Sequence, residues 1–216
     1  HYPLRRQRQM CIRDSVVGVG ELDYIGAILV GIVEEVGKII VVGHYIKKQN
    51  TKYILNGLLL GACVGAGFAV FETAGYAFRV LLYSQDIYYM IKILFLRAVL
   101  SIGAHTVWTA IAAVGLVLAK GENEFENHYY YKPQFLKFLV LVIVLHAIWD
   151  MPITFGSSIH LVPVLLCIIA ITVALILLSS GLRQVSFIAD KARRNTFQYT
   201  EENTGENDVG GGRKDE

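Results

Sequence analysis

Cysteine, proline and charged residues are all scarce in this chain of 216 residues. It contains 3 cysteines and 4 prolines, and only 18% of its residues are charged. The cysteines form no CxxC motif and show no metal-ligand spacing, so we expect neither a disulfide framework nor a zinc-finger site. The net charge of +2 is small and no basic, aromatic-rich stripe is present, which argues against a nucleic-acid partner.

Long apolar runs are what the chain has instead. Hydrophobic residues make up 54% of it, which is typical of a protein that crosses a membrane several times. We therefore predict an all-α, polytopic transmembrane helix bundle. Its expected spans number about five, near residues 22–46, 54–82, 92–119, 134–155 and 159–181.

The two ends of the chain differ from the apolar middle. The string QMCIRDS near the start resembles a translated sequencing adapter, so we expect residues 1–15 to be a non-native leader that replaces a missing native portion. Residues 16–183 would then form the transmembrane core. The tail, 184–216, becomes polar and rich in glycine, and we predict that it is largely disordered.

The positive charges between the spans predict an orientation. Nine lysines and arginines fall in the segments 47–53, 120–133 and 183–194, the last of which follows the final span, and none falls in the segments 83–91 and 156–158. Positive residues collect on the cytoplasmic side of a membrane. We therefore expect an integral membrane protein, in a bacterial cell membrane, whose C-terminus is cytoplasmic.

The first predicted span carries three charged residues near its middle, Glu34, Glu35 and Lys38. Each ionised group at the centre of a membrane helix costs about 2.5–3.5 kcal/mol. Glu34 and Lys38 are four residues apart and can pair on one face, whereas Glu35 lies about 100° round the helix. We therefore expect groups from other spans to compensate these charges.

Three further spans carry ionisable residues at membrane depth: Glu72, Arg97, His105, His146 and Asp150. Taken singly, most have a structural explanation: Glu72 as an acid bonded to a neighbouring helix, Arg97 reaching the membrane surface, and His105 as a packing residue. His146 and Asp150 are more specific, because four-residue spacing lets the carboxylate fix the imidazole. Intramembrane ionisable groups face the bundle interior and pair there. We therefore predict that they share one pocket suited to acid–base chemistry on a water molecule.

In their order and spacing these residues resemble the motifs of the PrsW-type intramembrane proteases, in the superfamily of CAAX prenyl endopeptidases and bacteriocin-processing enzymes. The EExxK motif of that family corresponds to residues 34–38, and its GFAxxE motif to residues 67–72. Its third motif, an Arg and then a His, corresponds to Arg97 and His105. Its HxxxD motif corresponds to residues 146–150.

The resemblance implies hydrolysis of a peptide bond within or near the membrane. The first Glu of the motif pair polarises a water molecule in the superfamily, so Glu34 would be the general base with Glu72 alongside. His146 with Asp150 would stabilise the oxyanion. The expected catalytic residues are Glu34, Glu35, Glu72, His105, His146 and Asp150, supported by Lys38, Phe68 and Arg97.

One position departs from the wider superfamily, whose CAAX-type members have His where this chain has Glu72. Two carboxylates facing one water repel each other, so one must be protonated or a cation must lie between them. A zinc ion held by His105, His146 and Glu72 would meet this need. A metal-free glutamate mechanism is the other option. No HExxH motif is present to decide, and we slightly favour the metal-free mechanism.

The sequence thus predicts an intramembrane peptidase whose partners are the lipid bilayer and a membrane-anchored protein or peptide substrate. Two alternatives belong to other classes. The first alternative is a proton- or cation-coupled transporter, because buried acids and imidazoles also form proton relays. The second is a catalytically inactive membrane scaffold, which would be favoured if Glu34 were dispensable.

Overall fold

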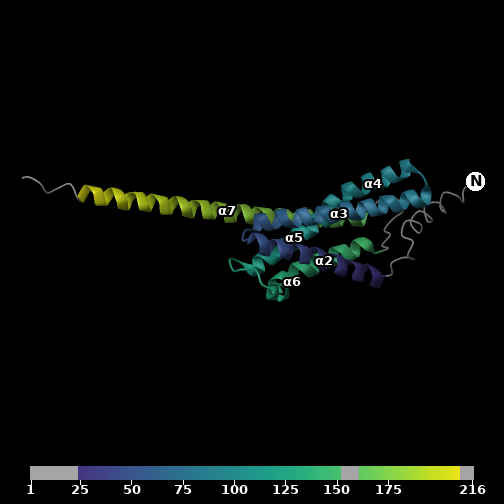
Figure 1. Cartoon of the computed structure of the whole chain (residues 1–216), viewed down its shortest axis with the longest axis horizontal. Helices are drawn as coiled ribbons and strands as arrows, with labels where there is room; N and C mark the ends of the chain where they lie inside the picture. The colour runs from purple at the N-terminus through teal and green to yellow at the C-terminus, as the bar shows by residue number, and fades with distance from the viewer. Residues whose placement is uncertain (1–23, 152–160, 210–216) are drawn as a thin grey trace, which may run out of the picture.

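The computed structural model describes residues 24–151 and 161–209, and this part of the chain is helical with no strand. The predicted all-α bundle is confirmed. In chain order the helices are α2 (Tyr24–Gln49), α3 (Ile54–Ser84), α4 (Ile87–Ser101), η1 (Ile102–Thr106), α5 (Val107–Lys120), η2 (Asn127–Tyr131), α6 (Pro133–Asp150) and α7 (Leu161–Val209) (Figure 1). The predicted leader and the residues 22–23, 152–155 and 159–160 of three predicted spans lie outside the described residues.

Four helical stretches in the described residues are long and apolar enough to cross a membrane: α3, the continuous stretch from α4 to α5, α6, and α7 up to Phe197. Helix α2 was predicted as a fifth span. Its 26 residues are long enough for a bilayer core of about 30 Å. It differs from the other four because Glu34, Glu35 and Lys38 lie at its centre, so its place in the membrane depends on how these charges are met.

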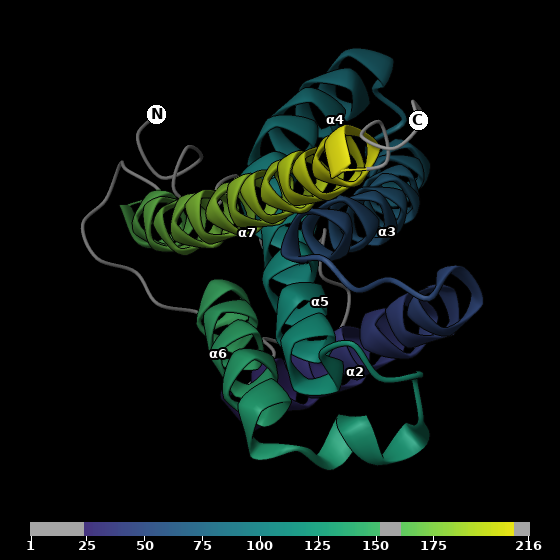
Figure 2. The same cartoon turned by 90° about the vertical axis from the view of Figure 1, so that its left-hand side faces the viewer.

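Helix α5 lies at the centre of the bundle, with α2, α3, α6 and α7 around it (Figure 2). All its residues from Trp108 to Val117 are buried. Glycines on α3 let it come close to α5: a Cβ atom at Gly61 would lie 2.5 Å from the carbonyl oxygen of Thr109. Small residues at helix contacts are the usual means of tight packing inside a membrane.

The third predicted span, 92–119, is divided by an irregular segment. The π-helical η1 joins α4 to α5, and Ala104 within it has φ −105° and ψ −107°, outside the helical region. Helix α7 packs closely against this segment. A Cβ atom at Gly103 would lie only 2.7 Å from the sulfur of Cys167 on α7. The segment contains His105, and π-helical turns occur often at functional sites.

Helix α7 runs far beyond the other helices (Figure 1). Where the composition predicts a largely disordered tail from residue 184, the structure continues α7 as a helix to Val209. No glycine or proline interrupts residues 182–203, and alanine, lysine and arginine in this stretch favour a helix. Residues 210–216 of the predicted tail lie outside the described part of the chain.

Candidate active site

One face of α2 turns towards α6 and α5 and carries two of the charged residues into the core. Its buried residues recur every three or four positions: Ala27, Gly31, Glu35, Lys38, Val42 and Ile46. Gly31 allows α2 and α6 to lie close together, since a Cβ atom there would lie 3.3 Å from the backbone nitrogen of Ala147 on α6. This close approach brings Glu35 against His146, near the end of α6.

Glu35 is completely buried and accepts two short contacts on one oxygen. Its Oε1 lies 2.8 Å from Lys38 Nζ and 2.8 Å from His146 Nδ1 on α6. The spacing predicted a pair between Glu34 and Lys38, and these two are 3.6 Å apart. Glu35 is the closer partner because Glu35 and Lys38 share the buried face, while Glu34 lies at its edge.

Lys38 connects α2 to η1. Its Nζ lies 2.9 Å from His105 Nδ1 and 4.1 Å from the centre of the Phe68 ring on α3. An ammonium group only donates hydrogen bonds, so His105 Nδ1 must accept and its Nε2 carries the ring proton. That Nε2 lies 2.9 Å from Glu72 Oε2 on α3. The contact with Lys38 therefore orients His105 towards Glu72.

Glu72 has a second cationic neighbour. Its Oε1 lies 2.8 Å from a terminal nitrogen of Arg97 on α4, and the guanidinium of Arg97 lies 3.8 Å from the centre of the Tyr76 ring. Arg97 therefore reaches inward to the acid, which rules out the alternative that it only extends to the membrane surface. Tyr76 was missed from the sequence, although it follows Glu72 by one helical turn.

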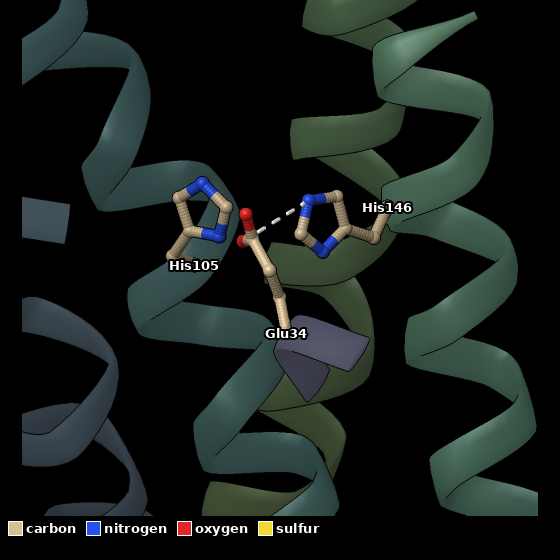
Figure 3. A group of neighbouring side chains, drawn as sticks. All are labelled: Glu34, His105 and His146. Carbon is tan, nitrogen blue, oxygen red and sulfur yellow. Dashed lines mark ion pairs between the residues drawn. The ribbon is translucent and has the colours of Figure 1, made fainter. Parts of the chain in front are cut away.

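The Nε2 side of His146 faces two partly exposed carboxylates. Glu34 Oε2 lies 3.6 Å from Nε2 and Asp150 Oδ2 lies 3.3 Å from it, and both acid side chains are about one quarter exposed. Figure 3 shows the Glu34 carboxylate between the rings of His105 and His146. The predicted pair of His146 and Asp150 is present, but the carboxylate that holds the other ring nitrogen is Glu35.

A tryptophan missed from the sequence packs on both imidazoles. Trp108 is fully buried, and its ring centre lies 5.3 Å from that of His105 and 5.2 Å from that of His146. Its position three residues after His105 on the same helical stretch was the available signal. A large apolar ring beside both imidazoles lowers the local polarity and strengthens the ionic contacts of the site.

All nine predicted site residues are therefore joined by direct contacts into one cluster drawn from five elements. It contains three acids that are partly open to the surface and a fully buried Glu35–Lys38–His146 group. Carboxylates and imidazoles at this range can accept a proton from water and return it to a leaving group.

The cluster also offers metal ligands. Single ligand atoms of Glu34, His105 and His146 lie within 4.8 Å of one another, and two imidazoles with one carboxylate match catalytic zinc sites in kind and number. Glu72, which we predicted as the carboxylate ligand, instead contacts His105 Nε2. The residues fit zinc after a rearrangement, because both ring nitrogens of His105 and both of His146 already have partners, and an ion would replace one on each ring.

Comparisons with known proteins agree with this geometry. A family model described as PrsW family intramembrane metalloprotease matches residues 8–178. A curated relative, Protease PrsW of Clostridioides difficile (strain 630), is 29% identical over 135 residues, which cover 62% of this chain and 53% of the relative. The chain thus spans about half the length of that relative. No solved structure gives a significant match. Because the family model covers most of the chain and includes all four motif groups of the cluster, the chain belongs to the PrsW family of intramembrane metalloproteases.

Proposed function

We propose that this chain is an intramembrane peptidase of a bacterial cell membrane that hydrolyses a peptide bond of a membrane-anchored protein. One observation carries the proposal. Glu34 Oε2 is buried, forms no hydrogen bond with any described residue, and lies 3.6 Å from His146 Nε2. A carboxylate oxygen that has no hydrogen-bond partner and lies beside an imidazole is placed to bind and deprotonate a water molecule.

In the proposed reaction, Glu34 accepts a proton from a water held between it and His146. The water oxygen forms a bond to the carbonyl carbon of the substrate, and the carbonyl oxygen takes the negative charge. His146, protonated on both ring nitrogens, donates to that oxygen from Nε2, while Glu35 at Nδ1 and Asp150 beside Nε2 stabilise the charged ring. When the C–N bond breaks, Glu34 returns its proton to the amine nitrogen that leaves.

The remaining charged residues hold these groups in place. Glu35 contacts Nδ1 of His146 and so leaves Nε2 facing the substrate side. Cationic side chains of this chain offset the repulsion between Glu34 and Glu72. Lys38 lies 3.6 Å from Glu34, and Arg97 lies 2.8 Å from Glu72. This arrangement supports a metal-free glutamate mechanism.

The metal alternative is supported by the family description and by the ligand group of Glu34, His105 and His146. Bound zinc would lower the pKa of a water towards ~7 and polarise the substrate carbonyl. In that case Glu35 would still orient His146, as carboxylates orient metal-binding histidines.

We further propose that the lysine-rich end of the bundle is cytoplasmic. Lys120 Nζ donates to the backbone oxygen of Thr51 at 3.1 Å, so two of the positive linkers lie together. The backbone nitrogen of Ile54 donates to Gln184 of α7 at 3.0 Å, so the tail leaves the bundle at the same end. Positive residues that share one end support a cytoplasmic location for it.

The test is proteolysis by the purified chain in liposomes, using a panel of tagged proteins that each contain one apolar helix. Wild type, Glu34→Gln and Glu34→Ala are compared with and without a chelator. We expect both variants to lose cleavage by about 100- to 10,000-fold, as for removal of a general base. Indifference to the chelator supports the glutamate mechanism, and loss restored by zinc supports the metal. Equal cleavage by all three proteins would contradict the proposal and favour the transporter or scaffold.

A further inference from the structure

A groove runs between α2 and α3 and reaches the candidate site. Its volume is about 1000 Å³, and apolar side chains of both helices form its walls, among them Val33, Val41, Leu59 and Phe71. Glu34 and Lys38 extend into it from α2, and Phe68 from α3. The groove is thus continuous with the carboxylate that we propose as the base.

Two glycines line the groove, Gly37 on α2 and Gly67 on α3, and close packing among the described residues requires neither. A Cβ atom at either position would meet no atom of this part of the chain within 4 Å. Gly61 and Gly65, on the other face of α3, instead touch α5. Gly67 therefore differs in role from the two packing glycines of the same stretch.

Glycine inside a helix costs about 1 kcal/mol relative to alanine. At Gly61 the close contact with α5 offsets this cost, whereas at Gly37 and Gly67 nothing in the described chain does so. Both lie directly beside site residues, Gly37 next to Lys38 and Gly67 next to Phe68. Missing side chains at these two points leave room for the backbone of another molecule beside Glu34.

The groove extends mainly to one side of Glu34. It follows α2 from Val33 to Gln49, a rise of about 24 Å along a helix. An extended chain covers that length with about seven residues. The far end is more polar, lined by Tyr45, Gln49 and Asn56, and lies beside the lysine-rich linker that follows α2.

We propose that this groove binds the substrate, as an unwound apolar segment of about seven residues that passes between Gly37 and Gly67. The inference rests on the proposed function and adds which part of the substrate is recognised: residues on the lysine-rich side of the cleaved bond. The segment is unwound because a helix ties up its carbonyl groups in its own hydrogen bonds. Apolar walls select apolar side chains, and the polar end receives the residues that leave the membrane.

One experiment measures cleavage in groove variants. Gly37→Leu and Gly67→Leu place a side chain in the groove, and Gly75→Leu is the matched control. Gly75 is also on α3, its Cβ position also has no atom of the described residues within 4 Å, and it does not line the groove. We expect the first two to lose about 10- to 200-fold in cleavage, the range for a mismatch in an apolar pocket, and the control to match wild type.

A second experiment measures binding without cleavage. Cys63 lines the groove and is free, while Cys167 on α7 serves as the internal reference. In Glu34→Gln liposomes that also carry Cys11→Ser, a membrane-permeant maleimide labels both cysteines, with or without a synthetic apolar single-span peptide. Peptide at ten times its Kd should slow Cys63 labelling about tenfold and leave Cys167 unchanged. The same protection should disappear in Gly67→Leu.

The outcomes separate the two proposals. Protection of Cys63 without cleavage by wild type would keep the groove and overturn the peptidase. Cleavage that depends on Glu34, with Cys63 unprotected and the glycine variants fully active, would keep the peptidase and overturn the groove. Cys63 that is equally shielded by lipid with no peptide present would assign the groove to acyl chains, which also overturns the proposal. The first arm of the labelling test, in Glu34→Gln liposomes, keeps both native glycines, so it holds even if a leucine variant fails to fold.

Discussion

The cluster has two halves that are built from the same kinds of residue and differ in exposure. The buried half consists of Glu35, Lys38 and His146, whose exposed fractions are 0%, 3% and 2%. The open half consists of Glu34, Glu72 and Asp150, whose side chains are 24%, 21% and 25% exposed. The acids of the two halves therefore differ in their access to water, although Glu34 and Glu35 are adjacent in the chain.

The comparison indicates that burial divides positioning from chemistry, with His146 at the boundary: Glu35 contacts its Nδ1, and its Nε2 faces the open acids. Glu35 and Lys38 have almost no access to water, so each must keep its partner or the fold loses much of its stability. An acid in the open half can be solvated in part, and can therefore exchange protons with water and substrate. We expect substitutions in the buried half to change stability most, and substitutions in the open half to change cleavage most.

The strongest test of this division compares the stability of the Glu35→Ala variant with that of the Glu34→Ala variant. Loss of Glu35 leaves Lys38 and His146 buried without their carboxylate, so the free energy of unfolding should fall by about 3–5 kcal/mol. Glu34→Ala should cost no more than about 1 kcal/mol, because its contacts are longer and partly solvated. Unfolding of both proteins in mixed micelles of increasing SDS content measures the difference. Equal destabilisation would show that the two halves are one structural unit.

Removing both members of the buried ion pair sharpens the result. Lys38→Met leaves Glu35 with a buried charge, and Glu35→Gln removes that charge. The double variant should therefore be more stable than the sum of the single losses predicts, by about 0.5–3 kcal/mol for residues in contact. The measurement is the same SDS unfolding series. Strict additivity would mean that the 2.8 Å contact contributes nothing by itself. Cleavage should stay lost, since His146 keeps no charged partner on Nδ1.

Much of this arrangement follows from the sequence. Four spans and the convergence of the charged residues could be predicted, because ionised groups in a membrane must pair inside the bundle. Which acid pairs with Lys38 could not be predicted. Lys38 lies within one turn of both Glu34 and Glu35, and which acid it meets depends on the face that α2 turns to α6. That rotation is set by Gly31 against Ala147, a contact between helices far apart in sequence.

Hydrophobic periodicity also does not reveal which face of α2 is buried. In a soluble helix the polar face marks the outside. The outer face of a membrane helix is apolar as well, so Ile40 at 60% exposed and Val42 fully buried look alike in the sequence. The same limit explains why the groove was missed: Gly67 follows Gly61 and Gly65 in one glycine-rich stretch, and only the structure separates packing from open space. The irregular η1 segment likewise has no sequence signal that we can identify.

Arg97→Gln probes the link between the open half and its cation. The side chain of Arg97 is 26% exposed, so its loss should lower the free energy of unfolding by no more than about 1 kcal/mol. Glu72 would no longer be drawn away from the base, and cleavage should fall about tenfold or more, as for loss of a charged hydrogen bond. Arg97→Lys keeps the charge and should recover part of the activity. A large stability loss in Arg97→Gln would place Arg97 with the buried half.

Asp150→Asn should have the smallest effect, and it tests the boundary between the halves. Asp150 lies 3.3 Å from His146 Nε2, and His146 keeps its shorter contact with Glu35 when Asp150 changes. The amide fills the same space, so the free energy of unfolding should stay within about 0.5 kcal/mol of wild type. Cleavage should fall about 2- to 10-fold, the equivalent of one hydrogen bond of about 0.5–1.5 kcal/mol. Steady-state kinetics should locate the loss in kcat with KM unchanged, because Asp150 would act on the transition state through His146 and does not line the groove. A loss as large as that of Glu34→Gln would instead make Asp150 a second base, and a rise in KM alone would make it part of the substrate site.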